Sequence, residues 1–118
     1  MQEIKGEIIM ATITEDYCSK EIYRLLIEKG FDGEIHTSYD EEGYTQASIT
    51  LQMAMKWLRK VYDIFIKLEF DVDEDIQWHS SLALIKGNKY IHTNELQWYD
   101  TYEQAVEAAI KYCLEHLI

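Results

Sequence analysis

The stretch TLQMAMKWLRKVYDIFIKLEFDV, residues 50–72, changes its hydrophobic period partway along, and this change decides the fold. In its first half, apolar side chains recur at the spacing of one helical face: Leu51, Ala54, Leu58 and Val61. Thr50 precedes them and can accept a hydrogen bond from a free amide of the first turn. Over residues 64–72, apolar side chains instead alternate with the others, as in a strand with one buried face. We therefore expect a helix, then a strand, with a tight turn between them near Asp63.

Two further helices are predicted, one towards each end of the chain. The first covers about residues 15–29, with Thr14 as its N-cap and Gly30 at the left-handed position after its last turn. The second begins after Asp100 or Thr101 and carries an apolar stripe: Val106, Ala109, Ile110, Cys113, Leu114 and Leu117. Both helices are amphipathic, so each is expected to bury one side in a shared core.

The region after residue 72 reads as a hairpin. Residues 77–84 alternate like a strand, and the Gly-Asn pair at 87–88 can supply the positive φ angles of a two-residue turn. Residues 89–93 then return as the partner strand. Residues 95–99 either extend that strand or form a fourth one.

These elements predict the fold class. Residues 3–13 contain β-formers and predict a short strand, and residues 34–39 predict an edge strand within a longer loop. The strands after residue 64 are joined by short turns, so they must run antiparallel. We expect a single two-layer α+β domain over residues 1–118, in the order (β)α(β)αβββα, with three helices on a sheet of three to four strands.

The composition fits one folded domain and gives it a strongly negative surface. The 118 residues are 47% hydrophobic, with 22 acidic and 11 basic side chains and a net charge of −11. Such a chain repels nucleic acid and anionic membranes, so direct binding to either is not expected. Its longest aliphatic run, residues 8–11, is too short to cross a membrane, and no signal-peptide core is visible, so we expect a cytoplasmic protein. Cys18 and Cys113 fall on helical apolar stripes and are expected to be small buried hydrophobes.

Three blocks stand out along the chain: EIYRLLIEKGFDG at 21–33, TLQMAMKWLRK at 50–60 and DTYEQAVEAAIKYCLEHL at 100–117. In this order they resemble a family of short uncharacterised proteins from phages and mobile elements of gut Bacteroidetes, over nearly the whole chain. The chain departs from the family pattern at Lys60, where Glu is usual, and it lacks the Pro often found before the Thr of the second block. The resemblance implies the same fold and a mobile-element context, with the host cytoplasm as location. It carries no functional residue, because no activity is established for the family.

The acidic run at residues 71–75 comes nearest to a metal motif. Asp71, Asp73 and Asp75 match the first three ligand positions of a calcium loop. The match ends there, because Ile76 and Leu82 stand where the loop needs glycine and glutamate. We therefore interpret this run as a charged hairpin connection, which also resists pairing between sheet edges.

Histidine and serine form no catalytic pattern. The histidines lack the paired spacing of a zinc site with one another or with the cysteines: His36, His79, His92 and His116. In WHSS, residues 78–81, neighbouring strand residues point to opposite faces, so His79 cannot readily activate Ser80. Phosphate-loop and dinucleotide motifs are absent from the sequence. We expect no cofactor and no metal, and the pattern favours a protein that is not an enzyme.

The distribution of acidic residues is the most informative functional pattern. No Lys or Arg occurs between Lys29 and Lys56, or between Lys67 and Lys86. Ten of the 22 acidic residues lie in these two segments: Asp32, Glu34, Asp40, Glu41, Glu42, Glu69, Asp71, Asp73, Glu74 and Asp75. If the segments converge, they form a negative surface able to dock on a basic protein, and a mobile-element protein could use it to mimic nucleic-acid phosphates. Otherwise they are two solvated loops.

A second interaction hypothesis rests on aromatic residues in or beside the predicted loops: Tyr39, Tyr44, Trp98, Tyr99 and Tyr102. Aromatic side chains often anchor interfaces, so these could form a homodimer seam or a groove for a partner. The alternative is that they pack beneath the loops.

The sequence as a whole favours a non-enzymatic protein that acts by protein–protein contact through its acidic residues, as an accessory protein of a phage or mobile element. The predicted partner is a basic host protein, and a homodimer is a further option. The alternative is a small-molecule-binding or metal-binding domain, or an enzyme, whose site assembles only in three dimensions. Buried carboxylates in a cleft would favour that alternative. One uninterrupted acidic face without a pocket would favour the first hypothesis.

Overall fold

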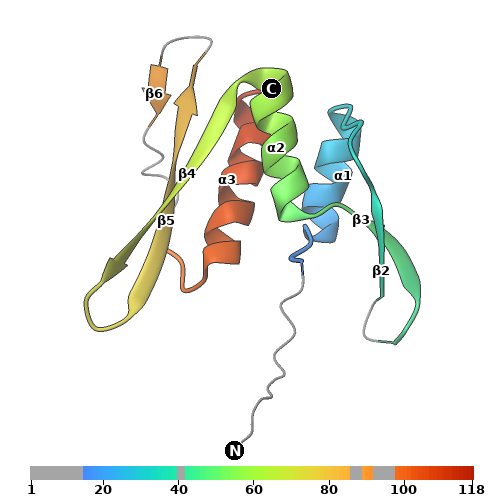
Figure 1. Cartoon of the computed structure of the whole chain (residues 1–118), viewed down its shortest axis with the longest axis horizontal. Helices are drawn as coiled ribbons and strands as arrows, with labels where there is room; N and C mark the ends of the chain where they lie inside the picture. The colour runs from blue at the N-terminus through green and yellow to red at the C-terminus, as the bar shows by residue number, and fades with distance from the viewer. Residues whose placement is uncertain (1–14, 40–41, 86–88, 92–97) are drawn as a thin grey trace, which may run out of the picture.

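The computed structural model describes residues 15–39, 42–85, 89–91 and 98–118 (Figure 1). These ranges form three helices and five strands in two antiparallel sheets, which confirms the predicted α+β class. The helices are α1 (Lys20–Glu28), α2 (Leu51–Tyr62) and α3 (Tyr102–His116). The strands are β2 (His36–Tyr39), β3 (Thr45–Ser48), β4 (Ile64–Val72), β5 (Ile76–Leu84) and β6 (Lys89–Ile91).

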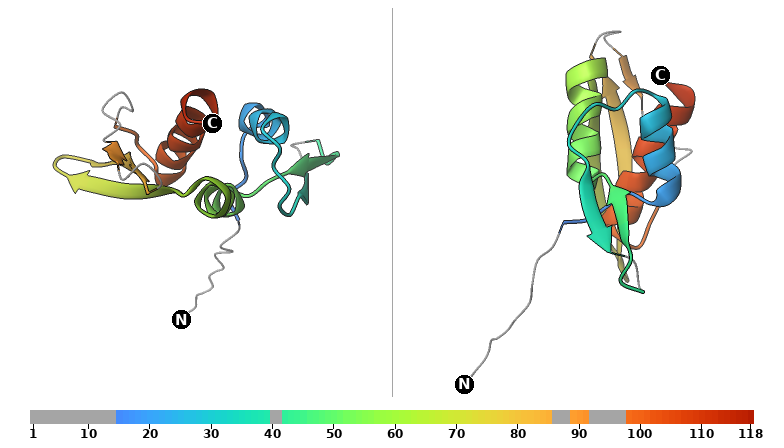
Figure 2. Two further views of the ribbon diagram at one scale, coloured as in Figure 1. Left: turned by 90° about the horizontal axis from the view of Figure 1, so that it is seen from above. Right: turned by 90° about the vertical axis from the view of Figure 1, so that its right-hand side faces the viewer.

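The elements are arranged as two small sheets with helices between them (Figure 2). One sheet has the order β4-β5-β6, and the other is the β2–β3 hairpin. α3 packs against β4 and β5, α1 packs against α3, and α2 lies between the two sheets. The prediction of one sheet was wrong, because residues 45–48 pair with β2 instead of remaining in a loop. The predicted strand over residues 3–13 lies outside the described residues.

The period change in the opening stretch takes place at one residue, Asp63. α2 begins after Thr50, whose hydroxyl accepts a hydrogen bond from the amide of Met53 at 3.0 Å. The helix ends at Asp63, which has a left-handed backbone with φ of 56° and donates its amide to the carbonyl of Leu58. This conformation stops the helical ladder and turns the chain directly into β4. The carbonyl of Asp63 also accepts a hydrogen bond from the amide of Ile85 at 3.2 Å, which ties the junction to the end of β5.

The β4–β5 ladder is long and only partly covered. Nine residue pairs run from Ile64 with Leu84 to Val72 with Ile76. Near α2 the apolar face is in the core, and Ile64 is only 2% exposed. Near the turn the same face is open, so the predicted burial of the whole strand face was wrong. The reason is length: nine strand residues span roughly 30 Å, whereas the 15 residues of α3 span roughly 22 Å and cross the strands.

One cluster of buried side chains joins the three helices to β4 and β5. Its completely buried large members come from the three helices, from β5 and, for Ile49, from the segment before α2: Ile22, Leu26, Ile49, Leu58, Leu82, Val106, Ile110, Cys113 and Leu114. Trp57 of α2 is buried, and the centroid of its ring lies 5.6 Å from that of Phe31, which follows α1, and 5.2 Å from that of Tyr62. Val61 was predicted on the buried face but is 52% exposed, because it lies in the last turn of α2, where the core ends.

α1 begins later than predicted. Its N-cap is Ser19, whose hydroxyl accepts a hydrogen bond from an amide of the first turn at 3.3 Å. The predicted cap, Thr14, lies outside the described residues. The chain before Ser19 is extended, and Cys18 donates its amide to the carbonyl of Ile49 at 2.8 Å. Cys18 is therefore buried as predicted, but from an extended segment that pairs with the entry to α2.

α3 agrees with its prediction. Its N-cap is Thr101, whose hydroxyl accepts a hydrogen bond from the amide of Gln104 at 3.1 Å. Its apolar stripe is buried except for Leu117, which is partly exposed. Just before the helix, Tyr99 exchanges two backbone hydrogen bonds of 2.7 Å with Trp78, so the chain returns along β5 there. The predicted turn at 87–88 and residues 92–97 lie outside the described residues.

Candidate functional site

The β4–β5 hairpin ends in an acidic turn that projects beyond α3 (Figure 1). We call its four acidic residues, all of which are exposed, the acidic tip: Asp71, Asp73, Glu74 and Asp75. None of them forms an ion pair with another described residue. No Lys or Arg lies between Lys67 and Lys86 in the sequence. The acidic tip therefore carries four formal negative charges that the neighbouring chain does not neutralise.

Local hydrogen bonds shape this turn without glycine or proline. The carboxylate of Asp71 accepts a hydrogen bond from the amide of Val72 at 3.1 Å. The amide of Asp73 donates to the carbonyl of Asp75 at 3.3 Å. Aspartate is favoured in such turns because its short side chain can bond nearby backbone amides. The residues that supply the charge therefore also help to form the turn.

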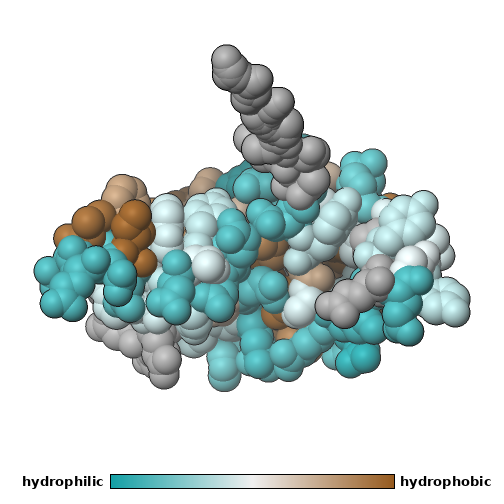
Figure 3. Space-filling view, turned by 90° about the horizontal axis from the view of Figure 1, so that it is seen from below, coloured by the Kyte–Doolittle hydropathy of each residue, from teal (hydrophilic) through white to brown (hydrophobic). Residues whose placement is uncertain are grey.

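An apolar row lies beside the acidic tip on one face of the hairpin. It consists of Phe70, Val72 and Ile76, which are 59%, 62% and 52% exposed. Strand alternation places the row on the ladder face that α3 covers further along. Ring contacts connect the row to α3. The centroid of the Trp78 ring lies 5.1 Å from that of Phe70 and 5.4 Å from that of Tyr102, at the start of α3. Figure 3 shows brown and teal surfaces side by side at this end of the molecule.

The opposite face of the hairpin carries polar contacts. A carboxylate oxygen of Glu69 lies 3.4 Å from His79, and its other oxygen lies 3.6 Å from the ammonium of Lys67. The ring of Trp98 lies 4.2 Å from that of His79. Beyond this contact is a shallow hollow of about 260 Å³ lined by Asp71, Asp73, Asp75, Gln77 and Trp98. Trp98, a predicted interaction residue, therefore lies next to the acidic tip.

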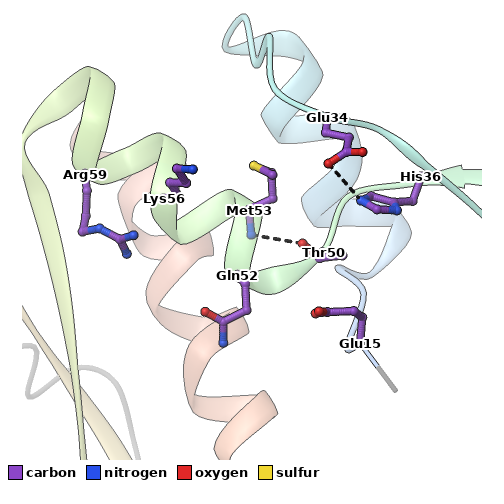
Figure 4. Close-up of a pocket in the computed structure, with 8 residues that line it drawn as sticks. All are labelled: Glu15, Glu34, His36, Thr50, Gln52, Met53, Lys56 and Arg59. Atoms are coloured by element: carbon purple, nitrogen blue, oxygen red, sulfur yellow. Dashed lines mark hydrogen bonds and ion pairs between the residues drawn. The ribbon is translucent and has the colours of Figure 1, made fainter. Parts of the chain in front are cut away.

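A second hollow, of about 330 Å³, lies beside the N-terminal half of α2 (Figure 4). Its lining comes from α2, β2 and the segments before them: Glu15, Glu34, His36, Thr50, Gln52, Met53, Lys56 and Arg59. Lys56 and Arg59 project from α2, and across from them Glu34 and His36 lie 3.6 Å apart. The hollow therefore has basic groups on one side and acidic groups on the other. Sequence reasoning missed it because its residues share no motif and come from separate segments.

The two acidic segments do not meet in the part of the chain that the structure describes. Glu42 follows β2 at the far hairpin, and the helices separate that hairpin from the acidic tip (Figures 1 and 2). Asp32 and Glu34 precede β2, while Asp40 and Glu41 lie outside the described residues. No described Asp or Glu is buried. Among these residues, neither one uninterrupted acidic face nor a cleft of buried carboxylates is formed.

The aromatic residues predicted as a seam are divided in the same way. Tyr39 and Tyr44, 72% and 70% exposed, belong to the β2–β3 hairpin. Trp98, Tyr99 and Tyr102 lie beside the other hairpin, where Tyr99 pairs with β5 through its backbone. The five residues therefore do not share one surface, and a homodimer seam that uses all of them is not formed. Trp98, at 46% exposed, is the member that stands beside the acidic tip.

Metal ligands and reactive thiols are not gathered in the described residues. There, no group of three or more His, Cys, Asp and Glu side chains is arranged to hold a metal ion. Cys18 and Cys113 are buried, and this burial raises the pKa of each thiol from 9.0 to about 12. The charge of Glu107 adds to the rise in the pKa of Cys18. Thiols of this kind stay protonated near neutral pH, so neither cysteine is an activated nucleophile.

Comparisons with protein-family models, curated proteins and solved structures found no match to this chain. The resemblance to phage and mobile-element proteins therefore stays a prediction. In the described ranges, no helix combines the length and the apolar character needed to span a membrane.

Sequence reasoning found the acidic tip and Trp98 but missed the apolar row. Period-two alternation predicts one buried face along the whole of β4, and it does not reveal where the cover ends. A signal was nevertheless present, because Val72 and Ile76 border a run of acidic residues. Charged turns stay in contact with water, so other elements do not pack over the apolar residues next to them, and those residues remain exposed.

Proposed function

We propose that the protein is a binding module rather than an enzyme, and that the acidic tip contacts a basic partner protein. The observation that carries this proposal is the projection of four exposed carboxylates at the end of a nine-pair ladder, beyond α3. The ladder contains Asp71 and ends at the pair Val72 and Ile76, so it anchors both ends of the short turn that carries Asp73, Glu74 and Asp75. Such preorganisation lowers the entropy cost of binding.

Charge defines the chemical class of the partner. A chain of net charge −11 repels polyanions, and its acidic tip attracts surfaces rich in Lys and Arg. Complementary charge mainly speeds encounter and selects partners, and exposed ion pairs are screened by salt. We therefore expect the contact through the acidic tip to weaken as ionic strength rises.

Mimicry of nucleic-acid phosphates is a narrower form of the same proposal. An extended mimic needs acidic groups distributed along one surface, and the second acidic segment lies at the other hairpin. The proposal is therefore restricted to a local basic patch on the partner. An accessory role in a phage or mobile element is supported by the sequence resemblance alone.

Affinity capture with matched charge variants tests the proposal. The tip variant reverses three acidic residues of the turn to lysine: Asp73, Glu74 and Asp75. The control variant reverses three acidic residues of the other base-free segment: Asp32, Glu34 and Glu42. Each variant raises the net charge by six units from the wild-type value of −11, so the two variants carry the same net charge. Captured proteins are identified at low and at high salt by mass spectrometry.

The expected result is a basic protein that the wild type and the control variant retain at low salt and that the tip variant loses. Equal capture by the tip and control variants would contradict the proposal, because net charge alone would then explain binding. Loss of folding is checked by circular dichroism of each variant before capture.

A second candidate function is binding of a small zwitterionic ligand in the hollow beside α2. The observation that favours it is the opposition of Lys56 and Arg59 to Glu15 and Glu34 across about 330 Å³ (Figure 4). A set of amino acids can be screened by thermal shift. Stabilisation that disappears in Arg59→Ala would support this function, and no stabilisation by any of them would count against it.

A further inference from the structure

The apolar row gives the hairpin a second kind of surface besides charge. Val72 and Ile76 are directly paired across the strands, and Phe70 pairs with Trp78 two residues further towards the body. More than half of each side chain in the row is exposed. Apolar groups grouped in this way beside charged ones mark interaction sites more often than isolated exposed apolar residues do.

The position of the row decides which secondary structure can cover it. The row lies on the face of the ladder, whereas an added strand would pair with a ladder edge and leave the face open. A helix with an apolar stripe can lie on a sheet face, as α3 does on the same ladder nearer the core. The shape of the row therefore favours a helix.

The acidic tip decides the charge of that helix. A second copy of this chain that docked through its own apolar row would bring its acidic tip near the first one, and like charges across an interface oppose association. A helix with Lys or Arg beside its apolar stripe would pair with the carboxylates instead. We infer that the docking element of the partner is a cationic amphipathic helix, seated on Phe70, Val72 and Ile76 with its basic residues at the acidic tip. This inference rests on the proposed function and names the chemistry of the partner.

The inference is tested by peptide binding to the full-length protein, measured by fluorescence anisotropy. The probe is a synthetic helix-forming peptide of about 18 residues, or five turns, with leucine at helical spacing and lysine on the flanks. A second peptide replaces each lysine with glutamate. A third keeps the composition of the probe but scatters the leucines around the helix.

One substitution in the apolar row has a close match elsewhere. Ile76→Thr removes apolar surface from the row and keeps a β-branched residue suited to a strand. Ile35→Thr makes the same change at a residue of similar exposure, 47% against 52%, near the other hairpin. Both variants are melted by circular dichroism to show that they remain folded.

We expect the probe to bind at least about tenfold more tightly than either control peptide, and Ile76→Thr to weaken it by about tenfold. Ile35→Thr is expected to change binding less than about twofold. No binding of the probe would overturn the inference, as would equal binding of the glutamate peptide or equal effects of the two substitutions. Self-association of the wild type that Ile76→Thr removes would also overturn it, because a second copy would then be the occupant.

The two proposals can fail separately. If capture depends on the acidic tip but the peptides do not bind, only the helix is wrong and a basic partner of another shape remains. If capture does not depend on the acidic tip, the proposed function fails and the inference that rests on it falls too.

Discussion

The left-handed backbone of Asp63 makes a sharp prediction about stability. Substitution by valine places a β-branched side chain at φ of 56°, where such residues are genuine outliers. The left-handed backbone conformation is roughly 1–2 kcal/mol less favourable than the right-handed one for most residues, and this difference is smaller for aspartate than for valine. Asp63 is exposed, so little packing is lost on substitution. We therefore expect Asp63→Val to lower the free energy of unfolding by about 1–2 kcal/mol.

Glycine at this position is expected to behave differently. Asp63→Gly relieves the backbone strain, but it also gives the unfolded chain more freedom, at a cost of about 0.5–1 kcal/mol. The two effects oppose each other, so the net change is expected to be close to zero. The contrast between valine and glycine separates backbone strain from loss of the carboxylate.

Thermal unfolding followed by circular dichroism measures both variants. For a chain of 118 residues the entropy of unfolding is about 0.25 kcal/mol/K, so Asp63→Val should lower Tm by about 4–8 °C. Asp32→Val is the control, because Asp32 is an exposed aspartate whose φ is not positive. An unchanged Tm for Asp63→Val would refute the reasoning. An equal loss for Asp63→Gly would show that the carboxylate matters, not φ.

Three further predictions concern burial. Leu82→Ala, at a fully buried position, is expected to lower the free energy of unfolding measured by chemical denaturation by about 2–5 kcal/mol, and Val72→Ala is expected to lower it by less than about 0.5 kcal/mol. Similar losses for the two variants would mean that the apolar row is packed against other residues. Ser48→Ala should be neutral or add up to about 1 kcal/mol, because its buried hydroxyl has no hydrogen-bond partner among the described residues, and a clear loss of stability would reveal one. Folding raises the pKa of Cys18 and of Cys113 from 9.0 to about 12, so the folded state holds these two thiol protons more tightly than the unfolded state does. The contribution of the two thiols to stability is therefore fully present below pH 9 and is lost as the pH rises towards 12. Unfolding free energies measured at about pH 8 and about pH 10 should therefore fall less in Cys113→Ala than in the wild type, and parallel falls would contradict this linkage.

Local sequence determined the type of most elements. The helix before Asp63, the strand after it and the helix after Thr101 were predicted within a residue or two of their observed bounds. The N-caps of α2 and α3 were also predictable, since a hydroxyl accepts a hydrogen bond from an amide only three residues away. The charge of the acidic tip could also be predicted from local sequence. Residues 71–75 contain four acidic residues and no basic one, and their charge does not depend on contacts with distant segments.

Tertiary structure alone decided where burial ends and which segments meet. The extended pairing of Cys18 with Ile49 replaces the first turn predicted for α1, because hydrogen bonds to the distant segment that leads into α2 compete with local ones. The exposure of Val61 and of the apolar row depends on how far other elements reach over a helix or strand, and periodicity carries no information about that reach. The separation of the two acidic segments has the same origin. Each segment forms its own hairpin, and the helices packed between the hairpins set the distance between their charges.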